Sequence, residues 1–129
     1  MIVNGYIETN KGYVYISDVT KDHKLVNLLT PTLITDIKKS ETNVVAKFKY
    51  NTKLKVTLDS KIRTIHGIKT VGDLAGKTFY LQQLSGRVLP DEIVVVHLKK
   101  PVACYDIQSE KTDTFYCEGY PFITGDSEC

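Results

Sequence analysis

The sequence predicts an all-β fold, and two observations carry that prediction. Of the 129 residues, thirteen are Val, eleven are Ile and fourteen are Thr, so 38 are β-branched, whereas Ala occurs only three times. Branching at Cβ costs side-chain freedom in a helix and packs well on a pleated surface. Turn-forming residues also separate short apolar runs at fairly regular intervals, as they do in β proteins. The length is that of one compact domain, which we expect to span residues 1–129.

Turn residues divide the first half of the chain into five expected strands. Asn10-Lys11-Gly12 separates the first two, and the polar segment 38–42 separates the third from the fourth. The fourth and fifth are expected to form a hairpin with a two-residue turn at Asn51-Thr52. Its apolar side chains alternate with lysines, which predicts one buried and one solvated face. The expected strands are 2–9, 13–19, 33–37, 44–50 and 53–57, and the apolar hairpin residues are Phe48, Tyr50, Leu54 and Val56.

Five more strands are expected in the second half, together with one helical turn. The run from Ile93 to Val96 is apolar on both faces, which indicates a central strand. The turns fall at His66-Gly67, at 85–87 and at Glu118-Gly119, and the segment 71–76 is the one place where a helical turn fits. The expected strands are 62–65, 77–83, 93–98, 102–108 and 114–117.

The charge balance argues against nucleic-acid and membrane partners. Seventeen Lys and Arg against fifteen Asp and Glu give a net charge of +2, with the signs interspersed. A nucleic-acid-binding domain is typically far more basic. No apolar run approaches the roughly 18 residues that span a bilayer, and no signal-peptide pattern opens the chain. We therefore expect a protein located inside the cell or in a virion.

The cysteines and histidines do not form a recognisable metal or disulfide pattern. Cys104, Cys117 and Cys129 are odd in number and lack the paired C-x2-C spacing of a zinc ribbon. Cys104 and Cys117 are expected to be free core thiols, with a disulfide between them as the alternative, and Cys129 is expected to be exposed. His23, His66 and His97 are scattered along the chain. No metal site and no cofactor are expected.

One hairpin face carries a basic stripe of lysines. Such a stripe can contact phosphate, but the aromatic residues that alternate with it should point to the opposite face, toward the core. A solvated strand is therefore the favoured interpretation, and glycine-rich phosphate loops are absent from the sequence. The stripe consists of Lys47, Lys49, Lys53 and Lys55.

Three stretches, read in order, carry motifs of a known superfamily. They are GYIETNKG at 5–12 followed by Ile16 and Asp18-Val19, VTLDSKIRTIHG at 56–67, and YDIQ at 105–108 followed by TFYCEGYPF at 114–122. Together they resemble the opening, central and closing motifs of the Hint superfamily, which comprises inteins and the hedgehog autoprocessing domain. The resemblance implies a flattened β-horseshoe with pseudo-twofold halves, whose two chain ends meet in a central cleft.

The resemblance also implies a chemistry, from which this sequence departs. Splicing inteins need an N-terminal Cys or Ser nucleophile, a Thr and a His in the central motif, a carboxylate and a second His in the closing strands, and a final His-Asn. In this chain the nucleophile falls at or just before Met1, which offers no thiol or hydroxyl. The other matching positions are Thr57, Ser60 in place of the first imidazole, Asp106, Asp113 in place of the second imidazole, Ile123 in place of the last His and Thr124 in place of Asn.

These replacements predict a catalytically degenerate Hint-like domain that is not an enzyme. Its expected role is structural, as an assembly module whose partners are other protein subunits, and the Lys-, Ile-, Asn- and Thr-rich usage of an AT-rich genome suggests a phage or virion component. Thr57 is expected to hydrogen-bond backbone in the cleft, and Asp106 to cap strand ends. One alternative is residual self-cleavage of a longer precursor. The other is an unrelated small β-barrel binding module.

Overall fold

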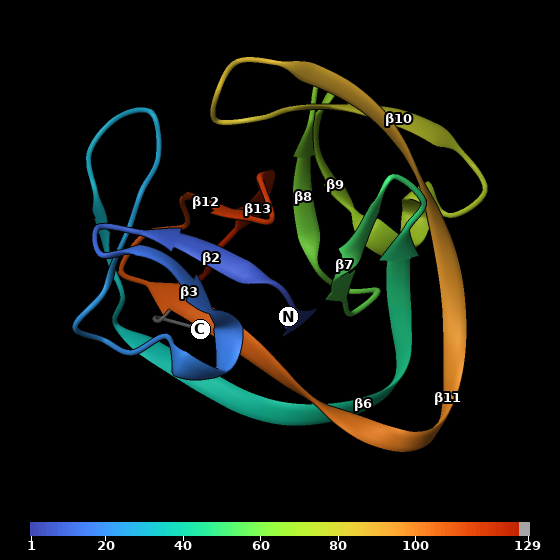
Figure 1. Cartoon of the computed structure of the whole chain (residues 1–129), viewed down its shortest axis with the longest axis horizontal. Coiled ribbons are helices and arrows are strands. Elements are labelled where there is room, and N and C mark those ends of the chain that lie inside the picture. The colour runs from blue at the N-terminus through green and yellow to red at the C-terminus, as the bar shows by residue number, and fades with distance from the viewer. Residues whose placement is uncertain (127–129) are drawn as a thin grey trace.

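The computed structural model describes residues 1–126, which form strands joined by short turns (Figure 1). Cys129 lies outside the described residues. The helical segments of the described range are two 3-10 turns, η1 (Ile16–Asp18) and η2 (Val71–Leu74). The all-β prediction is therefore confirmed, and η2 lies where a helical turn was expected. The strands are β1 (Ile2–Asn4), β2 (Tyr6–Thr9), β3 (Gly12–Tyr15), β4 (Lys24–Leu25), β5 (Thr32–Leu33), β6 (Asp36–Phe48), β7 (Asn51–Val56), β8 (Lys61–Thr64), β9 (Gly67–Thr70), β10 (Thr78–Gln82), β11 (Val88–Ser109), β12 (Thr114–Cys117), β13 (Tyr120–Ile123) and β14 (Gly125–Asp126).

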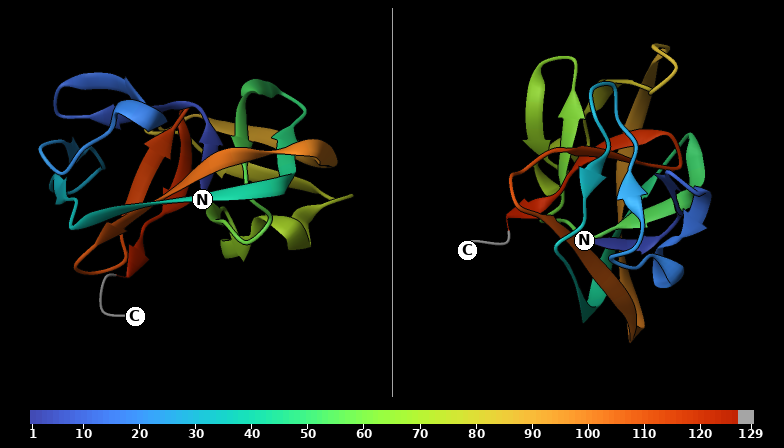
Figure 2. Two further views of the ribbon diagram at one scale, coloured as in Figure 1. Left: turned by 90° about the horizontal axis from the view of Figure 1, so that it is seen from below. Right: turned by 90° about the vertical axis from the view of Figure 1, so that its left-hand side faces the viewer.

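The strands form two curled sheets. One has the order β1-β7-β6-β11-β10, with β14 beside β11 and a further pairing of β1 with β11. The other has the order β5-β4-β2-β12-β13-β8-β9, with β3 beside β2. The long antiparallel pair β6–β11 curves around one side of the molecule like a horseshoe, and the short strands fill the space between its arms (Figures 1 and 2).

The long strands differ from the sequence prediction in two places. The segment 38–42, expected to be a connection, belongs to β6 and pairs with β11 through backbone hydrogen bonds. Its side chains are largely exposed, so its sequence carries no alternation that would reveal a strand. β11 is one strand rather than two, although its register with β6 shifts between His97 and Val102. Pro101 lies within that irregularity, where a residue without an N–H is tolerated.

The run from Ile93 to Val96 is neither flanked by strands on both sides nor buried on both faces. It pairs with β6, whereas β10 pairs with the preceding part of β11, residues 88–92. Ile93 is buried, whereas Val94 is 52% exposed. The expectation of two buried faces was wrong, because the face that carries Val94 is partly open to solvent.

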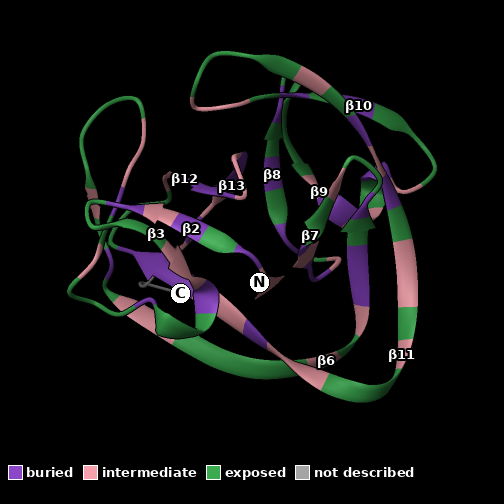
Figure 3. Cartoon of the chain, viewed as in Figure 1, coloured by how far each residue is buried: buried purple, intermediate pink, exposed green. Residues whose placement is uncertain are grey.

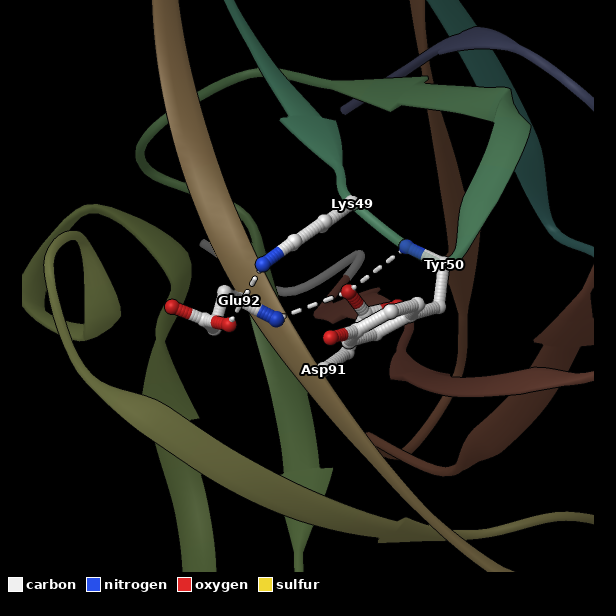
Figure 4. Close-up of polar contacts among 4 residues, drawn as sticks. All are labelled: Lys49, Tyr50, Asp91 and Glu92. Atoms are coloured by element: carbon white, nitrogen blue, oxygen red, sulfur yellow. Dashed lines mark hydrogen bonds and ion pairs between the residues drawn. The ribbon is translucent and has the colours of Figure 1, made fainter.

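The predicted hairpin β6–β7 is present, but its turn lies at Lys49-Tyr50 rather than at Asn51-Thr52. The Tyr50 side chain is consequently exposed, whereas Phe48, Leu54 and Val56 are buried as predicted. Contacts with β11 select this turn (Figure 4). The carboxylate of Asp91 accepts the Tyr50 N–H at 3.1 Å, and the Glu92 carbonyl accepts the Lys49 N–H at 3.0 Å.

Aromatic residues from both sheets pack together in the core. The buried segments of the chain are purple in Figure 3. Phe48 meets Phe79, Tyr120 and Phe122 edge-on, with ring centroids 6.3, 5.4 and 6.3 Å apart. Such edge-to-face pairs add to the stabilisation from buried apolar area. The arrangement fixes the β12–β13 hairpin against β6 and so positions the end of β13 near the start of β1.

Gly5 explains why the expected strand 2–9 is divided into β1 and β2. Its φ is +148°, a conformation that residues with a side chain rarely adopt. A Cβ at this position would lie 2.6 Å from the Cys117 Sγ. The chain can therefore cross from one sheet to the other only because residue 5 has no side chain.

Candidate functional site

The backbone of Met1 is held by the turn between β7 and β8, residues 57–60. The Met1 amine donates to the Thr57 Oγ1 at 2.9 Å and to the Ser60 Oγ at 2.5 Å. The Met1 carbonyl accepts the Thr57 N–H at 2.9 Å and the Ser60 hydroxyl at 3.0 Å. Two side chains thus fix both polar groups of the first residue.

Local hydrogen bonds give the 57–60 turn its shape. The Thr57 carbonyl accepts the Ser60 N–H at 3.2 Å, and the Ser60 carbonyl accepts the Val71 N–H at 2.8 Å. The Thr57 hydroxyl donates its proton to the Asp59 carboxylate. The oxygen of this hydroxyl is therefore free to accept a hydrogen bond from the Met1 amine. The Gly72 N–H donates to the Leu58 carbonyl at 2.8 Å, so η2 also supports the turn.

Asp106 faces the same place from β11. Together with Met1, Ser60 and Ile123 it lines a small cavity of about 20 Å³, which has room for about one water molecule. Its carboxylate accepts the Gln108 side-chain amide at 3.2 Å. It also packs on Gly125, where a Cβ would come within 2.9 Å of Oδ2. The expected meeting of the first and the closing strands at one site is therefore found, with Thr57, Ser60 and Asp106 around Met1.

Burial governs the electrostatics of this site. It lowers the pKa of the Met1 amine below its usual value, while the negative charges of Asp59 and Asp106 act in the opposite direction. Burial raises the pKa of the Cys104 thiol. Both groups are therefore shifted toward their neutral forms.

Cys104 is a site residue that the sequence prediction missed. Its Sγ lies 3.4 Å from the Met1 Sδ, and its side chain is buried. Its position two residues before Asp106 could have indicated a place in the site, because residues i and i+2 of a strand point to the same face. Cys104 and Cys117 are both buried and free, as expected, so the alternative of a disulfide between them was wrong.

Asp113 and Thr124 lie together, apart from the residues around Met1. The Thr124 Oγ1 accepts the Asp113 N–H at 2.9 Å, and the Asp113 carbonyl accepts the Thr124 N–H at 2.9 Å. Thr124 also shares a hydrogen bond of 2.6 Å with Ser109. The Asp113 carboxylate accepts the hydroxyl of Thr32 at 2.6 Å. These two residues connect the end of β11 with β5 and the end of β13.

The three imidazoles are distributed over the fold. His23 caps its own turn through the Thr20 N–H at 2.9 Å, and His66 is exposed in the β8–β9 turn. His97 is exposed on β11 but contributes to a hollow of about 400 Å³ next to Met1, which Asp59 and Cys104 also line. No group of three His, Cys, Asp or Glu side chains that could hold a metal occurs within the described residues. Neither helical turn there is long and apolar enough to cross a membrane.

Comparison of the sequence with protein-family models and with curated proteins finds no match. Among solved structures, the fold is similar to that of a bacterial intein-like domain from Clostridium thermocellum, with a TM-score of 0.77 and 19% identity over 96% of this chain and 98% of that one. It is also similar to the gp41-1 intein, with a TM-score of 0.71 and 10% identity over 96% and 95% of the two chains. A third similar structure is a DnaB intein from Synechocystis sp. PCC 6803, with a TM-score of 0.69 and 16% identity over 96% of this chain and 98% of that one. The β-horseshoe is thus confirmed, and the alternative of an unrelated β-barrel was wrong.

Proposed function

From the premise that this chain has the Hint fold of the inteins, we propose that it is a catalytically inactive member of that fold and serves as a structural or assembly module with other protein subunits as its partners. One observation carries the proposal. The residues that hold the first residue are in place, whereas the groups that would perform the chemistry are replaced or are engaged elsewhere.

The replacements affect each step of splicing separately. An acyl shift needs a thiol or hydroxyl at the family's nucleophile position, which falls at or just before Met1, and the Met1 side chain ends in a thioether. Expulsion of the amine needs a proton donor that titrates near neutral pH, and Ser60 occupies the position of that imidazole. Release of the chain by cyclisation needs a side-chain amide, and Thr124 has none. Its hydroxyl is also occupied by Asp113 and Ser109.

A second function, cleavage at the start of the chain, is favoured by a different observation. The hollow beside Met1 is lined by a carboxylate, an imidazole and a thiol, from Asp59, His97 and Cys104. These are the side-chain types of acid–base and nucleophilic catalysis. Under this alternative, His97 on β11 would take over the proton transfer for which the 57–60 turn has no imidazole.

A fusion between two reporter proteins tests both functions. We expect the unaltered domain to give one intact product by mass spectrometry over days. Cleaved products that disappear in the T57A/D106A variant would overturn the inactive assignment. Their loss in C104A and H97A as well would establish the second function in its place.

Restoring the missing groups together provides the positive control. M1C, S60H, I123H and T124N in one chain are expected to recover cleavage at the first residue, whereas any single one of them is expected to recover nothing. Members of a catalytic set depend on one another, so their separate effects do not add.

A further inference from the structure

A second hollow lies beside β6, β7 and β11, and Met1 is not among the residues that line it. It measures about 370 Å³, which is within the range of small-molecule sites. Its apolar lining is Val3, Val45, Leu98, Val102 and Ala103, and its polar lining is Asn4, Tyr15, Ser17, Lys47, Lys55 and Tyr105.

Two lysines lie side by side in the lining of this hollow. Lys47 of β6 and Lys55 of β7 are direct cross-strand partners, and Asn4 of β1 pairs with Lys55 on the other side. Like charges directly opposite each other destabilise a sheet. Within the described part of the chain, the ion pair that forms is Lys49–Glu92, so neither Lys47 nor Lys55 is neutralised by a carboxylate there.

Asn4 and Tyr15 are already hydrogen-bonded within the protein, and the Asn4 amide donates to the Lys53 carbonyl at 2.7 Å. The Tyr15 hydroxyl donates to the Asn4 side chain, which sets that ring along the wall. On β11 the ring of Tyr105 forms another wall, and the Lys39 Nζ lies 5.9 Å from the centre of that ring.

We propose that this hollow binds a small organic anion, a carboxylate or phosphate attached to an apolar body. The anionic group would lie beside Lys47 and Lys55 and relieve their repulsion, and the apolar body would cover Leu98, Val102 and Ala103. The sequence predicted that the basic stripe faces solvent. Two of its lysines, Lys47 and Lys55, also line this hollow together with apolar side chains. The inference does not depend on the proposed function.

Octanoate and octyl phosphate are the probes. Octanol, which lacks the anionic group, and inorganic phosphate, which lacks the apolar body, serve as half-ligands. Binding is followed by amide chemical shifts of the full chain. We expect saturable shifts at Leu98, Val102 and Ala103, and affinity for the complete anions at least about tenfold higher than for either half-ligand, since hydrogen bonds to charged groups contribute that much. The tighter of the two anions identifies whether carboxylate or phosphate is the better head group.

Charge-neutral variants decide the assignment. K47Q/K55Q should weaken octanoate binding at least about tenfold. Its melting temperature should not fall, because a repulsive pair is removed. K53Q/K69Q removes two exposed lysines outside the hollow and should leave the affinity unchanged. Equal binding of octanol and octanoate, unchanged affinity in K47Q/K55Q, shifts that map elsewhere, or tighter binding of single-stranded DNA than of octanoate would each overturn the proposal.

Discussion

Replacing Tyr120 by Phe removes one hydroxyl from the centre of the molecule and little else. Tyr120 is buried, its ring lies edge-on to Phe48, and its hydroxyl donates to the carboxylate of Asp91, which is fully buried. Phe preserves the ring contact. The variant therefore isolates the hydrogen bond that connects β13 to β11.

The expected loss follows from the partners that remain. A hydrogen bond to a charged acceptor contributes about 1.5–3 kcal/mol. The carboxylate of Asp91 keeps the N–H groups of Tyr50 and Glu92, at 3.1 and 2.7 Å. We expect Tyr120→Phe to lower the free energy of unfolding by about 2 kcal/mol, which corresponds to roughly 6–8 °C in melting temperature for a chain of this length.

The same bond predicts a dependence on alkaline pH. Burial and the Asp91 carboxylate raise the pKa of Tyr120 above the usual value of a tyrosine, which is about 10. Above that pH the unfolded chain releases the phenol proton while the folded chain keeps it, so the stabilisation is present below pH 10 and is lost as the pH rises. The difference between the parent chain and Tyr120→Phe should shrink by about 1.4 kcal/mol between pH 8 and pH 11.

Urea titrations at several pH values measure both effects. Tyr80→Phe is the matched control, because Tyr80 is 44% exposed, and it should change the free energy of unfolding by less than about 0.5 kcal/mol. If Tyr120→Phe were equally neutral, or its effect were constant from pH 8 to pH 11, the bond to Asp91 would not stabilise the fold and the reasoning would fail.

Three further outcomes are expected. Gly5→Ala should lower the free energy of unfolding, measured by urea titration, by about 2–3 kcal/mol, because the new Cβ would collide with the Cys117 sulfur at a positive φ. A neutral effect would contradict the role of Gly5 in the crossing between the sheets. Thr124→Val keeps the shape but leaves the Asp113 N–H without its acceptor, so it should cost about 1–3 kcal/mol, and Ile123→Val is its control. Adding EDTA should leave the melting temperature unchanged, and a fall of several degrees would reveal a metal that stabilises the fold.

The strands were predictable wherever one face is buried and the other is wet, and they were missed where pairing alone defines them. Phe48, Leu54 and Val56 alternate with polar residues, so β6 and β7 could be located from the sequence. The segment 38–42 is polar on both faces and is a strand only because β11 lies beside it. The Lys49-Tyr50 turn was missed for a related reason. Its geometry depends on Asp91, a partner far away in the chain.

The site was predictable in part through the motif positions. Thr57 was expected to hydrogen-bond backbone in the cleft, and it does so at Met1. Asp106 was expected to cap a strand end, yet it contacts a neighbouring side chain and packs on Gly125. The mutual pairing of Asp113 and Thr124 could not be read from the sequence, because it depends on how the end of β13 returns to the end of β11.

The position of β1 bears on how the chain folds in time. Ile2 pairs with Val56 on one side and with Tyr105 on the other, so the first strand has no complete binding partner until both distant segments are present. The entropy of closing such loops is lost before the contacts form, which places sheets of this kind among the slow folders, in milliseconds to seconds. During synthesis β1 leaves the ribosome before both of its partners, so its pairing must wait until β7 and β11 have emerged. The surroundings of Met1, which include Asp106 of β11, are completed only then.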